Sequence, residues 1–364
     1  MEIRHYTVNT ITEFITSEQF LALKHIPVTK HRAVSHTHNP RASGEDKILF
    51  VAYDNNEIAG YIGVLPDRMV HQDMTEKIGW LSCFWVDPGY RGKNISVSLF
   101  SGVMEAWDNK ILITNMTPGT INFYLRTDLF RQPLYKTGIR GYLRFNLANI
   151  LPPKSILFKK TVPFLKVLDF TGNIMNSARL YFYPRYNVSK DLRVEYKNDI
   201  TPEAKEFISG YNRQEFIKRG KPELEWILKY PWILEGNWGD HDSRRYYFSS
   251  VAKRFIYHCV QLFDASDRMV GFLILSVRND HLTVPYYYGE QDRQKDIVKF
   301  LINYMRDLEV NMITIFHTEL SETLKSLRSP FLFKKKILRP YLCPKVLDIT
   351  GLNFQDGDGD SVFT

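Results

Sequence analysis

Short apolar runs separated by polar turns dominate the first half of the chain. Continuous or alternating apolar runs are typical of strands, whereas apolar residues three and four apart are typical of helices. The polar run Asp54-Asn55-Asn56-Glu57 lies between two apolar runs and has the composition of a hairpin turn. From the N-terminus, the predicted elements are a helix over 17–25, strands over 48–53, 58–65 and 78–86, a helix over 95–107, a strand over 110–115, a helix over 120–126 and a strand over 139–147.

The second half repeats this order of elements. A strand, a polar turn and a strand cover 260–275, another strand covers 282–288, and a helix over 291–308 leads to the strand MITIFH. The segments VLDFTG (167–172) and VLDITG (346–351) are nearly identical and lie 179 residues apart (346 − 167). The repeated order predicts a mixed α/β fold, an α+β mixed sheet that occurs twice in tandem.

These patterns divide the chain into four segments. We expect a first domain over 1–153, a bridging segment over 154–190, a second domain over 191–352 and an acidic tail over 353–364. The tail, QDGDGDSVFT, spaces its aspartates as the start of a calcium-binding loop does, but the closing glutamate is missing. We therefore expect a disordered acidic end.

Composition narrows the class of protein. With 364 residues and 44% apolar content, the chain is long enough for two hydrophobic cores. Its three cysteines, Cys83, Cys259 and Cys343, are far apart and show no CxxC spacing, which favours a reducing compartment over disulfides or a zinc site. Neither a signal-peptide core nor a long apolar run is evident, so the prediction is a cytoplasmic protein without a membrane partner.

The formal net charge of +8 suits a polyanionic partner. The basic residues are scattered, with small clusters at Lys159-Lys160, Arg244-Arg245 and 334–336 that we interpret as solvated surface. No zinc finger or other nucleic-acid motif is present, so nucleic acid is not expected as a partner.

The strongest chemical signal is the loop after the predicted strand over 78–86. That strand ends in Asp87-Pro88-Gly89, a small basic loop follows over 91–94, and a helical pattern begins at Ile95. Free N–H groups at a helix N-terminus and the helix dipole favour phosphate groups, so this order predicts a pyrophosphate site. The P-loop string GxxxxGK[ST] and the dinucleotide string GxGxxG are both absent.

The segment resembles the acyl-CoA-binding motif of the GCN5-related N-acetyltransferase (GNAT) superfamily. In that family a strand and V-x-P are followed by R-G-x-G-x-G/A and a helix. Val86, Pro88, Arg91, Gly92 and Lys93 match in order. The resemblance covers about residues 40–150 and implies that acetyl-CoA, or another acyl-CoA, is a co-substrate.

Two positions depart from the family pattern. Asn94 replaces a glycine and Ser96 replaces a glycine or alanine, but asparagine tolerates a left-handed backbone and serine is small. The residues that the resemblance implies for the cofactor are Phe84, Trp85, Val86, Arg91, Gly92, Lys93, Asn94, Ile95, Ser96 and Thr117.

The resemblance also implies a general acid. TPGTINFYLRTDLF follows the family's N-x-x-A-x-x-x-Y-x-x-x-G-F, with Thr117 in the asparagine place and Tyr124 in the tyrosine place. Tyr124 is therefore the predicted acid, and a core tyrosine is the alternative. The family's glutamate has no counterpart in IGWLSCFWV, so Asp67 and His71 are the candidate bases, with Glu76 weaker and a water relay as the alternative.

A polar string before the first buried strand, HTHNPRA, lies near the expected acceptor site. Arg41 could recognise an anionic acceptor, and His36 and His38 have no identifiable third partner for a metal ion. We predict no metal site. Cys83 has no histidine at a diagnostic spacing, which favours direct attack over a covalent route.

The second copy departs from the first at the loop. Where the first has VDPGYRGKN, the second has YYYGEQDRQ, whose carboxylates repel a pyrophosphate. We predict a degenerate second domain that completes a cleft, stiffens the first domain or forms a homodimer. The predicted function is CoA-dependent N-acyl transfer, most simply acetyl transfer, to a primary amine of a small molecule or sugar. The alternatives are a non-catalytic CoA-binding scaffold and an aminoacyl transferase of the Fem type.

Overall fold

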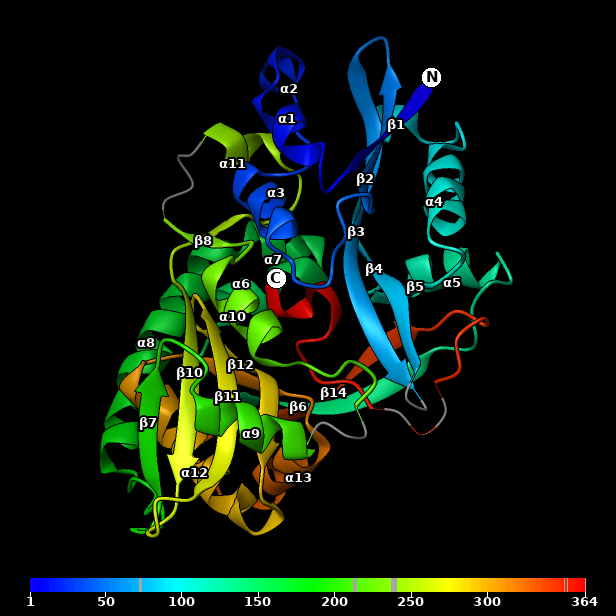
Figure 1. Ribbon diagram of the computed structural model, residues 1–364. Coiled ribbons are helices and arrows are strands. Elements are labelled where there is room, and N and C mark those ends of the chain that lie inside the picture. Colours follow the sequence, from blue (N-terminus) through cyan, green and yellow to red (C-terminus); the bar gives the residue numbers. More distant parts are fainter. Residues whose placement is uncertain (72–73, 212–214, 237–240, 350, 352, 364) are drawn as a thin grey trace.

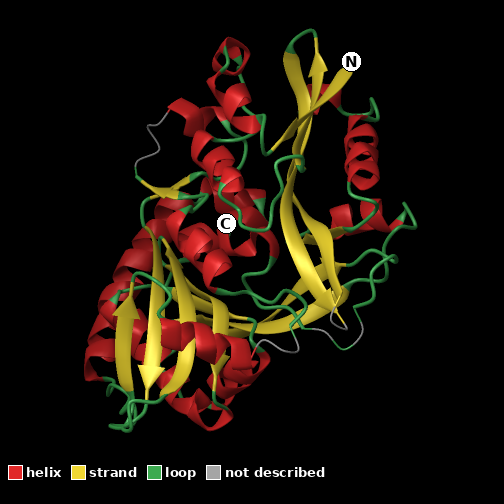
Figure 2. Cartoon of the chain, in the orientation of Figure 1, coloured by secondary structure: helices red, strands yellow, loops and turns green. Residues whose placement is uncertain are grey.

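The chain folds around one continuous mixed sheet with helices on both faces (Figures 1 and 2). The computed structural model describes residues 1–71, 74–211, 215–236, 241–349, 351 and 353–363. In order across the sheet, its strands are β1 (Glu2–Thr7), β2 (Lys47–Asp54), β3 (Glu57–His71), β4 (Met74–Val86), β5 (Ile111–Thr114), β14 (Phe333–Leu342), β6 (Leu134–Tyr142), β13 (Met312–Ile315), β12 (His281–Gly289), β11 (Met269–Arg278), β10 (Phe255–Phe263) and β7 (Arg193–Lys197). A separate pair joins β8 (Leu234–Glu235) to β9 (Val251–Ala252).

Helices cover each half of the sheet on both sides, and each side has its own apolar cluster. In the first half, α1 (Ile11–Thr16), α2 (Glu18–Ala22) and α3 (Lys30–Thr37) lie opposite α4 (Ile95–Ala106) and α5 (Pro118–Leu125). In the second half, α9 (Pro202–Tyr211) and α10 (Lys221–Lys229) lie opposite α12 (Gln294–Asp307), α13 (Thr318–Ser326) and α8 (Val162–Phe182). The short helices are α6 (Leu147–Ile150), α7 (Ile156–Lys160) and α11 (His241–Arg245).

Among the described helices, none combines the length and the apolar composition that crossing a membrane requires.

The two halves exchange a strand at the centre of the sheet. β6, from the first half, pairs with β13 of the second, and β14, from the second half, pairs with β5 of the first. β6 and β14 also pair with each other, antiparallel, from Phe333↔Tyr142 to Tyr341↔Leu134. The last strand of each half is therefore built into the sheet of the other half.

The strand order repeats about this central pair, but with a spacing different from the one the sequence suggested. Ser82 of β4 corresponds to Thr283 of β12, and Trp85 corresponds to Tyr286, an offset of 201 residues (283 − 82 and 286 − 85). The near-identical segments 179 residues apart are not equivalent, because 167–172 lies within α8 and 346–351 follows β14. Their likeness is therefore no trace of the repeat.

Most elements of the first half agree with the pattern of the sequence. The predicted strands over 48–53, 58–65, 78–86 and 110–115 are β2 to β5, and the predicted helix over 95–107 is α4. The predicted mixed α/β fold is confirmed. The bridging segment is largely helical because α7 and α8 occupy it, and the strand predicted over 139–147 begins and ends earlier as β6.

A buried ion network joins the halves beneath the sheet. Asp67 of β3, with 1% of its side chain exposed, accepts from Arg41 Nη1 at 3.0 Å and from Arg219 Nη2 at 2.7 Å. Trp80 Nε1 donates to Asp67 Oδ2 at 3.1 Å, and Asp358 Oδ1 lies 3.6 Å from Arg219 Nε. Burial acts to raise the pKa of Asp67, but Arg219 and Arg41 outweigh it and hold that pKa below its usual value.

We predict that Asp67→Asn lowers the free energy of unfolding by about 3–5 kcal/mol, because it removes the buried carboxylate that the guanidinium groups of Arg41 and Arg219 share. Denaturant titration measures this loss. Since the native pKa of Asp67 is lowered, its contribution is present above the unfolded-state pKa of about 3.9 and disappears as pH falls through the native value. The difference in the free energy of unfolding between the wild type and Asp67→Asn should therefore become smaller in acid.

The matched control is Asp128→Asn, which removes an exposed ion pair with Lys345. We expect no measurable change there, because solvent screens such pairs. Equal losses in the two variants would contradict the role assigned to the buried network.

Candidate active site

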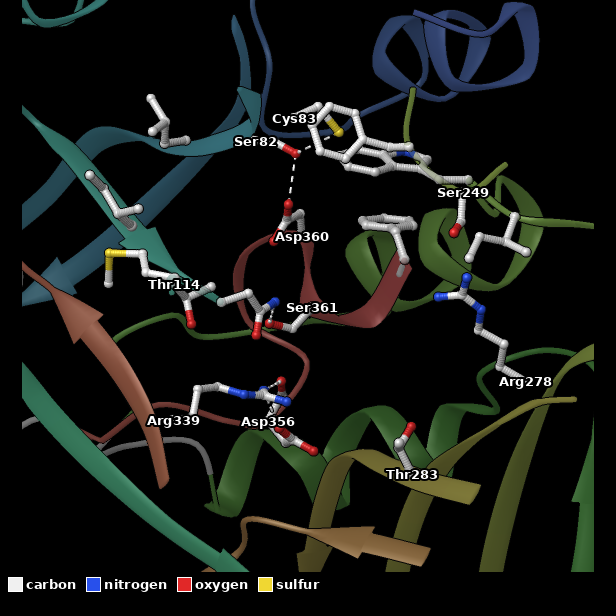
Figure 3. A pocket seen from close by; sticks show the side chains of 18 of the residues that line it. Ser82, Cys83, Thr114, Ser249, Arg278, Thr283, Arg339, Asp356, Asp360 and Ser361 are labelled. Carbon is white, nitrogen blue, oxygen red and sulfur yellow. Dashed lines mark hydrogen bonds and ion pairs between the residues drawn. The ribbon is translucent and has the colours of Figure 1, made fainter. Parts of the chain in front are cut away.

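A cavity opens where β4 and β5 separate. These parallel strands pair only at Gly79↔Ile111 and Trp80↔Leu112, and beyond those pairs they diverge. The gap holds a cavity of about 600 Å³. Its lining comes from β4 and the end of β5 in the first half and from β11, β12, β13 and the C-terminal segment in the second (Figure 3).

A β-bulge in β4 borders this cavity. The register between β3 and β4 shifts between Tyr61 and Gly63, so Cys83 and Phe84 face a single residue of β3. Cys83 has φ of 52°, a left-handed value that a non-glycine residue keeps only where its surroundings fix it. Arg32 Nη1 contacts its Sγ. The bulge takes backbone groups of β4 out of the sheet ladder beside the cavity.

Arg32 connects this bulge to the second half. It lies on α3, is buried, and donates to Ser82 Oγ at 2.9 Å and to the Tyr246 hydroxyl at 2.8 Å. Its guanidinium carbon lies 3.9 Å from the Trp232 ring centroid. Arg32 is therefore part of the cavity wall, and its guanidinium group is engaged in these contacts.

The C-terminal segment, residues 353–363, crosses the cleft and forms part of the cavity wall (Figure 3). Ser82 Oγ donates to Asp360 Oδ2 at 2.7 Å, and Asn115 Nδ2 donates to Ser361 Oγ at 3.0 Å. Phe363 is buried and stacks on Trp232 with 4.5 Å between ring centroids. The expected disorder of this acidic end was wrong, because its apolar residues are buried and its polar ones have partners in both halves.

Two carboxylates of this segment line the cavity. Asp356 forms an ion pair with Arg339. Asp360 accepts from Ser82, and none of the ion pairs in the described ranges includes it. Burial raises the pKa of Asp360, and Ser82 and Arg32 offset this only in part. Sequence reasoning missed both carboxylates, although the Val-Phe pair after them was a signal of burial.

Three of the predicted residues line the cavity. Phe84 belongs to the bulge, Thr117 caps α5 by accepting from the Thr120 N–H, and Tyr124 lies about two turns further along α5. Tyr124 is 4% exposed and packs against Phe100, and burial raises its pKa well above the usual value. A phenol with a raised pKa keeps its proton, as a general acid must.

The predicted loop begins directly after β4, at the end of the bulged strand. Asn94 adopts the left-handed conformation (φ 58°) that the sequence suggested, and Gly92 does the same at φ 82°. Among the main-chain bonds of the described residues, the Ser98 N–H is the first in α4 with an acceptor, the Asn94 carbonyl. The N–H groups of the helix start are therefore directed away from the helix interior, where an anion fits.

The other residues predicted for the cofactor lie in or beside this loop. Arg91 and Lys93 are exposed, Ser96 is half-buried, and Ile95, the first residue of α4, is buried. Trp85 and Val86 form the end of β4, where Trp85 packs on Tyr61. The arrangement places the loop and the cavity along one strand.

Of the two predicted bases, Asp67 does not lie at the cavity, and the side chain of His71 is outside the residues that the structure describes. Asp67 lies outside the cavity lining and is bound by Arg41 and Arg219, so we reassign it to a structural role. His71 is the last residue of β3, and its side chain lies outside the described residues. Glu76 forms an ion pair with Lys110.

The acceptor residues predicted at 36–42 also have other partners. Arg41 is bonded to Asp67 and, at 2.9 Å, to Glu223, so it is not available to an acceptor. His36 is buried, and burial and Arg32 hold its pKa well below the usual value. His38 stacks on Tyr230. Among the described residues, no three histidine, cysteine or carboxylate side chains cluster as metal ligands do.

The second half has an equivalent opening, and the chain itself fills it. The β11–β12 register shifts between Ile274 and Ser276, a bulge at the place that corresponds to Cys83 and Phe84. Beyond it, the Tyr287 N–H donates to Gln355 Oε1 at 3.3 Å, and Gln355 Nε2 donates to the Tyr287 carbonyl at 3.0 Å. A side-chain amide thus pairs with the strand at the position equivalent to Val86 (287 − 201).

A protein-family profile matches part of the first half of the chain. The profile of the acetyltransferase (GNAT) family matches residues 14–126. No characterised protein sequence matches the chain significantly.

Solved structures share the fold over nearly the whole chain. A conserved protein of unknown function from Enterococcus faecalis V583, described as a probable N-acyltransferase, is 8% identical with a TM-score of 0.50, over 93% of this chain and 72% of its own. Saccharomyces cerevisiae N-myristoyltransferase with bound myristoyl-CoA is 11% identical with a TM-score of 0.52, over 94% of this chain and 82% of its own. At such identities the likeness establishes the fold.

Proposed function

We propose that this chain moves an acyl group from acyl-CoA to a primary amine. The premise is that residues 14–126 belong to the acetyltransferase (GNAT) family, which makes the chain a transferase. The observation that carries this proposal is the cavity between β4 and β5, bordered by the bulge at Cys83 and Phe84 and facing Asp360. The donor is acetyl-CoA or a longer acyl-CoA, and the acceptor is a small molecule or a sugar.

In this proposal the coenzyme lies along the end of β4. The pyrophosphate binds the loop over 91–96, where the start of α4 offers N–H groups and two cations. The pantetheine arm, which carries two amide groups, pairs with the backbone of 84–86. Gln355 supports this orientation, because its amide makes such a pair with the equivalent Tyr287.

The chemistry follows from the groups around the bulge. The amine nitrogen attacks the thioester carbonyl carbon, and the proton of the amine passes to Asp360. A hydrogen bond from Ser82 holds this carboxylate beside the bulge. The carbon–sulfur bond then breaks, and the sulfur of CoA takes a proton from Tyr124, which lines the same cavity. Asp360 replaces Asp67 and His71 as the base in this scheme because it alone combines position and an available carboxylate among the described residues.

We predict that the double variant Arg91→Gln/Lys93→Gln binds acetyl-CoA roughly three- to thirtyfold more weakly, because two cations at the helix start are lost. S-acetylpantetheine, which lacks the pyrophosphate, should bind the variant and the wild type equally. Isothermal titration calorimetry measures both ligands.

Lys159→Gln/Lys160→Gln is the matched control, since it removes two exposed cations from α7 and should leave both affinities unchanged. Equal weakening of the two ligands in the loop variant would argue against the pyrophosphate site. A wild type that binds acetyl-CoA but acylates no amine would favour a CoA-binding scaffold.

We predict that Asp360→Asn lowers kcat with a primary-amine acceptor by about 10²–10⁴-fold and leaves the acetyl-CoA affinity unchanged, because an amide cannot accept the proton. The base acts when ionised, so wild-type activity should fall as pH drops through the pKa of Asp360, which burial raises. The acid limb assigned to Asp360 should be missing from the variant's pH profile. An identical acid limb in both proteins would exclude Asp360 as the base.

A further inference from the structure

Polar side chains form a row across the sheet on the far side of the cavity. Ser276 of β11 pairs with Thr283 of β12, Thr283 with Thr314 of β13, and Thr314 with Arg140 of β6. Directly paired residues lie on the same face of a sheet, and all four line the cavity. A polar row on four central strands has a cost in core packing, which indicates that this face serves a ligand.

Two arginines and a histidine lie at the end of this row. Arg278 is the last residue of β11 and pairs with His281, the first of β12. Thr314 Oγ1 lies 2.8 Å from Arg140 Nε and 2.8 Å from His281 Nε2. Burial, together with Arg140 and Arg278, lowers the pKa of His281 to about 3, so the imidazole is neutral. The cluster therefore carries two positive charges.

Arg278 lacks a counter-ion in the ranges that the structure describes. Its side chain extends from the end of β11 toward the cavity (Figure 3), and it takes part in none of the ion pairs there. Burial lowers its pKa, and no neighbouring carboxylate offsets this effect. Two other arginines of the cavity differ, because Arg32 contacts Cys83 of the bulge and Arg339 forms an ion pair with Asp356.

We propose that Arg278 and Arg140 bind an anionic group, a carboxylate or a phosphate, of the acceptor whose amine is acylated near Asp360. This proposal rests on the proposed function, since it places the amine at the acyl-transfer end of the cavity. The acceptor is then a compound with an amine at one end and an anion at the other. The coenzyme's own phosphates lie elsewhere, at the loop over 91–96.

Matched pairs of amines test this assignment. The pairs are ethanolamine and O-phosphoethanolamine, glycinamide and glycine, and glucosamine and glucosamine 6-phosphate. Release of free CoA from acetyl-CoA measures turnover. We expect the anionic member of at least one pair to be preferred, and Arg278→Gln to raise its KM on the order of ten- to a hundredfold. The pair that responds tells a phosphate site from a carboxylate site.

Arg278→Lys keeps the charge and should retain part of the preference, whereas a loss of fold would affect both members of a pair equally. Lys335→Gln is the matched control, because Lys335 is an exposed cation paired with Arg140 across the sheet and outside the cavity lining. It should behave as the wild type. Circular dichroism checks that each variant is folded.

Three results would overturn the proposal. One is equal use of both members of every pair by the wild type. Another is an Arg278→Gln enzyme with an unchanged preference, and the third is a loss of acetyl-CoA affinity in that variant, which would assign the arginine to the coenzyme. If the wild type binds no acetyl-CoA, the proposed function fails, and calorimetry with inorganic phosphate still compares wild type with Arg278→Gln.

A second feature, independent of the cavity, is the apolar outer surface of α7 and α8. The inner side of α8 is fixed by buried residues such as Leu165 and Leu180. Nine large apolar side chains of the two helices are each more than half exposed: Ile156, Leu157, Phe164, Val167, Phe170, Ile174, Met175, Tyr181 and Phe182. A helix that is apolar on both its inner and outer sides is normally covered.

The charges on this segment indicate what covers it. Residues 154–182 include five basic residues, among them Lys159, Lys160 and Lys166, against the single acidic residue Asp169. The Asp169 carboxylate already has hydrogen-bond partners, since it accepts from the N–H groups of Leu147 and Ala148. A second copy of the chain would bring like charges together, whereas an anionic surface complements them.

We infer that α7 and α8 bind the surface of an anionic lipid bilayer, with the aromatic side chains at the level of the headgroups and the lysines at the phosphates. The prediction for the Lys159-Lys160 cluster as plain solvated surface is then replaced by a lipid-facing role. The helices lie on the bilayer and do not cross it.

Vesicle flotation tests the inference. We predict that the protein floats with vesicles of phosphatidylcholine and phosphatidylglycerol in equal amounts and floats far less with phosphatidylcholine alone. Phe170→Ser/Met175→Ser should abolish flotation. Lys159→Gln/Lys160→Gln should lower it by roughly tenfold or more, because each basic residue near such a surface contributes about 1 kcal/mol.

The matched control is Leu21→Ser, which changes an exposed apolar residue of α2, outside α7 and α8, and should leave flotation unchanged. Failure of the wild type to float would overturn the inference. A stable dimer in analytical ultracentrifugation that Phe170→Ser/Met175→Ser dissociates would assign the surface to a second copy and equally overturn it.

Discussion

The antiparallel pairing of β6 with β14 is the constraint on which the rest of the structure depends. Each strand completes the sheet of the half to which it does not belong by sequence, so neither half has a closed sheet without the other. Separating the halves would expose the edges of β5, β6, β13 and β14, an arrangement that proteins avoid. The two walls of the cavity are therefore fixed to each other by main-chain hydrogen bonds. The buried ion network at Asp67 also links the two halves.

The two similar halves differ in what occupies their openings. Both halves open a gap after a bulge, at β4–β5 and at β12–β13. The C-terminal segment enters the second gap, where Gln355 pairs with Tyr287, and then continues to the first, where Asp360 meets Ser82. One segment therefore fills the surplus opening and supplies a carboxylate to the other. The sequence predicted a degenerate second site from its acidic residues, and the pairing of Gln355 with Tyr287 is a second observation that favours this prediction.

Local chemistry made the first half predictable. The strands around the hairpin, the helix after the loop and the left-handed Asn94 each follow from a few neighbouring residues. The exchange of β6 and β14 does not, because strand order is set by long-range pairing that leaves no local pattern. The acidic end was misread for the same reason. In the sequence, the three aspartates of this segment have the pattern of a solvated tail. In the fold, Asp356 contacts Arg339, Asp358 lies near Arg219 and Asp360 accepts from Ser82, and all three partners lie outside the segment.

The charges of the cavity divide between the halves in a way that suits a two-ended acceptor. The bulge and Tyr124 come from the first half, whereas the cationic row at Arg278 comes mainly from the second. Asp360 lies between them and is held through Ser82. A ligand that bridges this span meets a carboxylate near the bulge and guanidinium groups beyond it, so an amine and an anion are each placed beside their complement. Under the proposed function, selectivity resides mainly in one half and acyl transfer in the other, and the strand exchange joins the two halves through main-chain hydrogen bonds.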